Sequence, residues 1–172
     1  MKHTIQVVCI TFCLVFISGC MTKSNLDLQS PSVKVSETAK FSAGKATDNS
    51  GYQFPPEEED KFDLAKAMQS SLDAALSQNG LKGKGYTIRV TILNYEPGSA
   101  FHRWLLPGFG GTKLTTESYV YSPAGKLVAK IPVHRSINAG GGFTIGAYRY
   151  VFDDVAAEIV RIIKTRLRGV NN

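Results

Sequence analysis

The chain has 172 residues, a net charge of +6 at neutral pH and 43% hydrophobic residues, which suits one domain with its own core. All three cysteines, Cys9, Cys13 and Cys20, lie at the N-terminus, so a chain cut before Cys20 has neither a disulfide framework nor a cysteine metal site. Basic charge can indicate nucleic-acid binding, but the export signal described next excludes nucleic acid as the expected partner.

Residues 1–20 have the pattern of a secretory signal. Lys2 gives a basic start, residues 5–17 are mostly apolar, and Ser18 and Gly19 place small side chains ahead of Cys20. The apolar run is too short to span a bilayer comfortably, which favours a cleaved signal peptide. The alternatives are an uncleaved signal anchor and plain secretion with Cys20 as an unmodified thiol.

The last four residues of this signal, Ile17-Ser18-Gly19-Cys20, resemble the lipobox of bacterial lipoproteins. The resemblance implies cleavage before Cys20 and acylation of both its thiol and its new amino group. Several acyl chains hold a protein stably on a membrane, because each buried methylene contributes about 0.8 kcal/mol. In lipoproteins of bacteria with two membranes, Asp after the modified Cys favours the inner membrane. Met21 follows here, so the resemblance implies the periplasmic face of the outer membrane.

The mature chain begins with a polar segment that lacks periodicity, which predicts a flexible lipidated tether. Val33, Val35 and Phe41 then predict a short strand, and residues 44–59 a loop. The resulting domain boundaries are a signal peptide at 1–19, a tether at 20–32, one α/β domain at 33–169 and a tail at 170–172.

The first helix is predicted by apolar residues that recur at intervals of three and four between Leu64 and Leu76. The acidic residues 57–60 precede it, where the helix dipole favours negative charge, and Asn79-Gly80 predicts its end. A second amphipathic helix is predicted over residues 151–168. Asp153 and Asp154 would lie in its first turn as partners of the dipole.

Three strands are predicted between the helices. Tyr86–Tyr95 alternates apolar and polar residues, and Lys113–Ser122 and Lys126–Ser136 form a hairpin around Pro123-Ala124-Gly125. Pro132 predicts a sheet edge or a bulge in the last strand. The order of elements predicts an α/β (α+β) two-layer sandwich, with two amphipathic helices on one face of a mixed, roughly four-stranded sheet.

Two loops, at residues 96–112 and 138–150, are both apolar and rich in glycine. Exposed aromatic and apolar patches mark interaction sites, so part of the first loop is a candidate contact surface for a partner protein or the membrane interface. The alternative is that its side chains cap the open end of the sheet as core. The candidate contact residues are Phe101, Arg103, Trp104, Leu105 and Phe109.

The glycine motifs of these loops include Gly98-Ser99, Gly108-Phe109-Gly110-Gly111 and Gly140-Gly141-Gly142. With them, residues 86–168 resemble an uncharacterised family of bacterial envelope lipoproteins that carries a domain of unknown function. The resemblance implies an α/β fold akin to the N-terminal domain of the periplasmic translocation protein of the Tol system. It implies no reaction.

The sequence shows no pattern typical of catalysis. The glycine-rich loops match neither the P-loop nor the dinucleotide-binding pattern, and His102 and His134 lack a third metal ligand at suitable spacing. Asp153 and Asp154 are adjacent and would diverge on a helix. We therefore expect no cofactor, no metal and no enzyme activity. The favoured function is a non-catalytic binding or assembly module, held on the membrane through Cys20, whose partner is an envelope protein or an acidic cell-wall polymer. The alternative is a small cell-wall hydrolase.

Overall fold

The computed structural model describes residues 21–29, 35–54, 62–98, 110–138 and 147–168. In chain order, its elements are β1 (Met21–Ser24), β2 (Asp27–Leu28), β3 (Phe41–Ala43), β4 (Thr47–Asp48), α2 (Leu64–Gln78), β5 (Tyr86–Glu96), β6 (Thr112–Tyr121), β7 (Leu127–Ile137), α4 (Ala147–Ile162) and the π-helical turn η2 (Ile163–Leu167).

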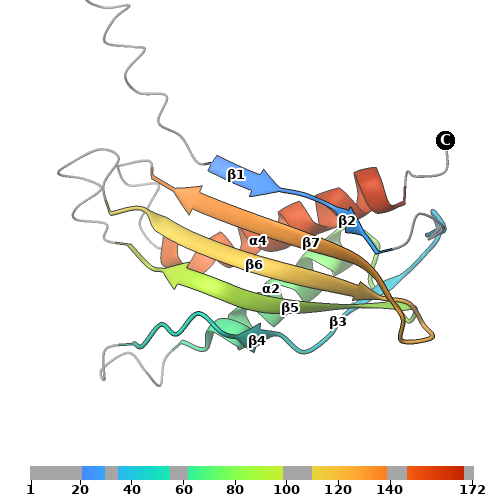
Figure 1. Ribbon diagram of the computed structural model, residues 1–172, viewed down its shortest axis with the longest axis horizontal. Coiled ribbons are helices and arrows are strands. Elements are labelled where there is room, and N and C mark those ends of the chain that lie inside the picture. The colour runs from blue at the N-terminus through green and yellow to red at the C-terminus, as the bar shows by residue number, and fades with distance from the viewer. Residues whose placement is uncertain (1–20, 30–34, 55–61, 99–109, 139–146, 169–172) are drawn as a thin grey trace, which may run out of the picture.

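These strands form one sheet in the order β1-β7-β6-β5-β3, with β2 also paired to β7 and β4 to β5. The short strands β3 and β4 run parallel to β5, and the other pairs are antiparallel. Figure 1 shows both helices on the same side of the sheet. The predicted two-layer α+β sandwich is therefore confirmed, with five main strands along the sheet rather than roughly four.

The core lies between the sheet and the two helices. On β5, Ile88, Val90 and Ile92 are buried, as the alternation predicts, and they face the apolar stripe of α2 that contains Met68 and Leu72. The hairpin between β6 and β7 also forms as predicted: Gly125 has a φ of 77°, and its N–H donates to the Ser122 carbonyl. Burial of these apolar side chains is the main force that holds the layers together.

The prediction of a free tether is wrong for residues 21–28. β1 pairs with Val133–Ser136 and β2 with Ala129–Lys130, so this segment adds the outermost strands beside β7. An edge strand can form from polar residues because the ladder uses backbone groups. The side chains of β1 also bond to polar partners, since Ser24 donates to Glu158 of α4. Residues 30–34 lie outside the described residues.

Pro132 does not place β7 at a sheet edge, because β1 and β2 pair beyond it. The break between β1 and β2 instead falls opposite this proline. Proline has no N–H to donate, whereas its carbonyl still accepts from the Asn25 N–H at 3.2 Å. The missing donor therefore interrupts the outer ladder and does not end the sheet.

Helix α2 begins at the first residue of its predicted apolar stripe, whereas α4 begins before its predicted start. Helix α2 begins after Asp63, whose carboxylate accepts from the Lys66 N–H at 2.9 Å and caps the helix. The acidic residues 57–60 lie outside the described residues, whereas Gly80 ends α2 with a φ of 66°, as predicted. The start of α4 at Ala147 places Asp153 and Asp154 beyond the first turn. Their predicted role as dipole partners is therefore wrong.

Thr116 on β6 offers a test of the packing between the layers. Its hydroxyl is buried against the helices and has no hydrogen-bond partner in the described structure. Thr116→Val should therefore raise the free energy of unfolding by about 1 kcal/mol, because it removes a desolvated polar group at nearly constant shape. Denaturant unfolding measures the change.

Thr112→Val is the matched control, on the same strand and the same face. Its hydroxyl donates to the Pro97 carbonyl at 2.7 Å, so the same substitution should lower the free energy of unfolding by about 1 kcal/mol. A decrease in both variants would show that the hydroxyl of Thr116 is not an uncompensated buried group.

Candidate functional site

The residues predicted from sequence as anchor and contact loop lie outside the described residues. Cys20 belongs to residues 1–20, and the five contact residues belong to residues 99–109. The structure does describe the residues that flank these segments. It brings the start of β1, the ends of β5 and β7 and the start of β6 to one end of the sheet, here called the Met21 end (Figure 1).

Polar contacts tie the strands together at the Met21 end. Lys113 on β6 forms an ion pair with Glu96 on β5 at 2.8 Å, and the hydrogen bond from this lysine lowers the pKa of the Glu96 carboxyl. Ser136 donates to the side-chain oxygen of Asn138 at 3.0 Å. The described residues that flank the two glycine-rich loops, at the ends of β5 and β7 and the start of β6, therefore lie at the same end of the sheet as Met21.

An aromatic cluster supports this end from the helix side, and its neighbouring ring centroids lie 4.9 to 6.4 Å apart. The Tyr95 hydroxyl donates to the Tyr148 carbonyl at 2.9 Å, and the Arg149 guanidinium lies 5.2 Å from the centroid of the Tyr148 ring. Sequence reasoning missed this cluster because its rings come from four separate segments. The members are Tyr52, Phe54, Phe62, Tyr95, Tyr148 and Phe152.

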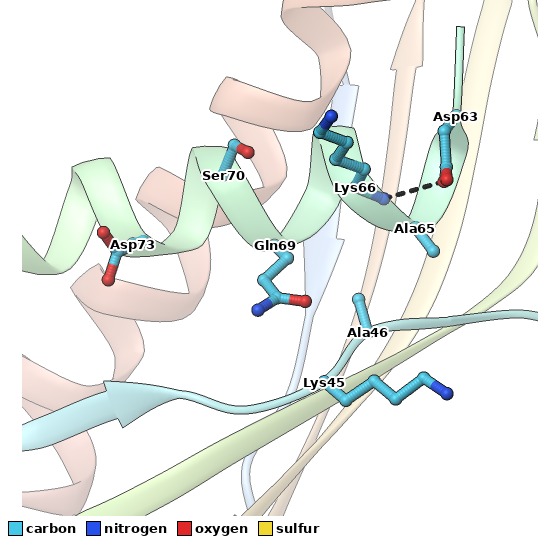
Figure 2. Close-up of a pocket in the computed structure, with 8 residues that line it drawn as sticks. All are labelled: Lys45, Ala46, Asp63, Ala65, Lys66, Gln69, Ser70 and Asp73. Carbon is cyan, nitrogen blue, oxygen red and sulfur yellow. Dashed lines mark hydrogen bonds between the residues drawn. The ribbon is translucent and has the colours of Figure 1, made fainter.

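A hollow of about 440 Å³ lies between α2 and the connection from β3 to β4 (Figure 2). Gln69 points from the helix towards Lys45 and Ala46 on this connection. The two carboxylates that line the hollow already have partners. Asp63 caps α2, and Asp73 forms an ion pair with Lys82 at 2.6 Å. The lining therefore suits polar binding better than acid–base chemistry. The lining residues are Lys45, Ala46, Asp63, Ala65, Lys66, Gln69, Ser70 and Asp73.

A second hollow, of about 410 Å³, lies at the opposite end of the sheet. This end, here called the Gly80 end, is where α2 ends, β5 begins and β6 turns into β7. Lys82 and Lys84 line it together with one carboxylate, Asp73, and the hydroxyl-bearing residues Ser42 and Thr87. No sequence motif indicates this hollow, because its residues come from β3, β5 and the connection between α2 and β5.

The sheet face away from the helices carries a shallow, largely apolar hollow of about 310 Å³. Leu93, at the bulge of β5, and Pro132, at the break beside β7, line it. His134 also lines it and forms a hydrogen bond with Thr115 at 2.9 Å, whereas His102 lies outside the described residues.

Two further searches cover only the described parts of the chain. Within them, His, Cys, Asp and Glu side chains nowhere gather in a group of three or more that could hold a metal ion. No helix among the same residues is long and apolar enough to cross a membrane.

Comparison with known proteins connects the fold to a family. A family model described as a domain of unknown function (DUF4410) matches residues 23–141. The chain belongs to this family. The DUF4410 match begins in β1 and ends before α4, so it extends further towards the N-terminus than the resemblance seen in the sequence. No curated protein matches the chain.

Several solved structures are similar to this DUF4410 chain at low sequence identity. A PelC dodecamer from Paraburkholderia phytofirmans is 11% identical with a TM-score of 0.51, and the match covers 85% of this chain and 99% of that one. Protein XCC0632 from Xanthomonas campestris is 11% identical over 78% and 88% of the two chains, with a TM-score of 0.49. A candidate lipoprotein from Caulobacter crescentus is 15% identical over 77% and 89%, with a TM-score of 0.42.

Proposed function

We propose that this DUF4410 protein is anchored by lipid on Cys20 at the periplasmic face of the outer membrane and acts there as a non-catalytic binding or assembly module. The lipobox-like sequence Ile17-Ser18-Gly19-Cys20 supports the anchor. The observation that carries the proposal is the start of β1 at Met21, which pairs with Ser136. The residue after the lipidated cysteine already belongs to the sheet, so the domain would sit at the bilayer without a free spacer.

This junction gives the domain a direction relative to the membrane. Chain connectivity keeps Cys20 next to Met21, so the Met21 end faces the bilayer. Strand β7 has 11 residues, and at about 3.3 Å per residue it places the Gly80 end roughly 35 Å further away. The Gly80 end would therefore face the periplasm.

Two observations favour binding or assembly over catalysis. The carboxylates in the hollow of Figure 2 cap a helix or form an ion pair, which leaves them poorly placed for proton transfer. PelC, which shares the fold, was crystallised as a dodecamer, and the same architecture in this chain is compatible with assembly from identical copies.

Substitution of Cys20 tests the anchor. Cys20→Ser should abolish the acyl mass on the N-terminal peptide and release the protein from washed membranes, because the thiol is the site of diacylation. Mass spectrometry of that peptide and membrane fractionation give the two measurements. Cys13→Ser is the matched control, since it changes a cysteine that cleavage removes, and it should leave both unchanged. A Cys20→Ser protein that stays on the membrane, beside a natural protein without acyl mass, would refute the proposal.

A further inference from the structure

Exposed positive charge gathers at the Gly80 end of the domain. The cations come from the segment before β3, the connection from α2 to β5, the turn between β6 and β7, and the turn η2. Among the described residues at this end, the carboxylates are Asp27, Glu37 and Asp73, so the exposed cations outnumber them. The exposed cations are Lys40, Lys82, Lys84, Lys126, Lys164 and Arg166.

Some of these cations have a structural role at the end of α2. The Lys40 ammonium donates to the Gly80 carbonyl at 2.6 Å, and the Lys164 ammonium to the side-chain oxygen of Asn79 at 3.2 Å. Positive charge is favourable at a helix C-terminus, which accounts for both contacts. Lys84 has no carboxylate within ion-pair distance among the described residues. The dipole of helix α2 explains the contacts of Lys40 and Lys164 but not the position of Lys84.

The chain around Lys82 and Lys84 is built closely against Lys40. A Cβ atom on Gly85 would lie 2.5 Å from the Lys40 carbonyl oxygen, and one on Gly83 would lie 3.0 Å from the Lys40 Cβ. Glycine at these two positions therefore allows the segment to run close beside the chain at Lys40. This path fixes the two lysines on the hollow of about 410 Å³.

The chemistry of this hollow suits an anionic group. Lys84 supplies an ammonium group with several donors and no ion pair among the described residues, and Lys82 supplies a second one that pairs with Asp73 at the same hollow. The Thr87 hydroxyl lies nearby, whereas the Ser42 hydroxyl already donates to the Tyr86 carbonyl. The neighbouring cations extend the positive surface beyond the hollow. A repeating anion would use this surface better than a single ion, because separate charges could engage separate cations.

We propose that the Gly80 end binds an anionic polysaccharide, a chain that carries carboxylate or phosphate groups, with Lys82 and Lys84 at the centre of the contact. The proposal rests on the envelope location given under the proposed function, which makes nucleic acid a poor candidate. Lipid headgroups are disfavoured because this end lies opposite Met21. The separation of roughly 35 Å exceeds the screening length of about 8 Å in physiological salt.

The test uses the mature lipidated protein in neutral detergent micelles and immobilised polygalacturonate as the probe. The natural protein should bind, and rising salt should weaken the binding. Lys82→Gln/Lys84→Gln should bind about tenfold more weakly, because each lysine near a polyanion contributes a severalfold gain in affinity. Lys45→Gln/Lys66→Gln, at the hollow of Figure 2, removes the same charge and should stay within about twofold of the natural protein.

Thermal unfolding of both double variants checks that each remains folded. Equal losses in the two variants would show that net charge alone drives binding and would overturn the proposal. So would the absence of binding, equal binding to neutral dextran, or equally tight binding to phosphatidylglycerol vesicles or duplex DNA. The measurement needs no membrane, so its failure is distinguishable from failure of the anchor, which the Cys20→Ser experiment tests.

Discussion

Phe152→Ala is expected to lower the free energy of unfolding by about 3–5 kcal/mol, the range for truncating a fully buried aromatic residue. Phe152 is 0% exposed on α4, and its ring lies 5.7 Å from the Phe62 ring and 5.6 Å from the Tyr95 ring, between centroids. The substitution leaves a cavity inside the aromatic cluster, because these neighbours are fixed by their own contacts. Denaturant unfolding measures the loss.

Leu93→Ala provides the control, since Leu93 is 47% exposed on the other face of the sheet. Its truncation should change the free energy of unfolding by less than about 0.5 kcal/mol. A small effect for Phe152→Ala would mean that the cluster repacks freely and does not support the Met21 end. Similar losses for the two variants would contradict the division between a buried and an open face.

Regular elements with a strong apolar period were predictable from the sequence. The alternation in β5 and the three-and-four spacing in α2 each identify one buried face, and Gly80 and Gly125 stand where the backbone needs positive φ. The strands β1 and β2 were not predictable in this way. They lie at the edge of the sheet, and their pairing with β7 depends on backbone groups that every residue has.

The functional surfaces are harder to predict because they combine short segments distant in the chain. Net charge was visible in the sequence, but its concentration at the Gly80 end depends on how four segments meet. Asp153 and Asp154 show a similar limit. Their role as dipole partners assumed a helix start at Val151. The helix begins earlier, at Ala147, so both residues lie beyond its first turn and contact neighbouring elements instead. Asp153 accepts from Ser71 of α2, and Asp154 pairs with Arg135 of β7.

Asp154→Ala is expected to lower the free energy of unfolding by about 2 kcal/mol, between the values for exposed and fully buried ion pairs. Arg135 is only 16% exposed, and its guanidinium lies 2.6 Å from the Asp154 carboxylate. Removal of the carboxylate leaves a poorly solvated positive charge between the layers. Denaturant unfolding measures this loss. The control is Asp73→Ala, which breaks the ion pair with Lys82, whose two side chains are 51% (Lys82) and 43% (Asp73) exposed. This control should lower the free energy of unfolding by less than about 0.5 kcal/mol.

The comparison isolates burial, because both substitutions replace a helical aspartate with alanine and gain the same helix propensity. Arg135 also donates to the Thr22 hydroxyl on β1 at 2.8 Å, so a displaced Arg135 should loosen the strand that follows Cys20. Faster amide hydrogen exchange across β1 in Asp154→Ala, but not in Asp73→Ala, is the expected signature. Equal costs and unchanged exchange would mean that this ion pair is solvated like a surface pair. The bond from Arg135 to Thr22 would then contribute little to holding β1, which would keep its backbone ladder to β7 and the bond from Ser24 to Glu158 of α4.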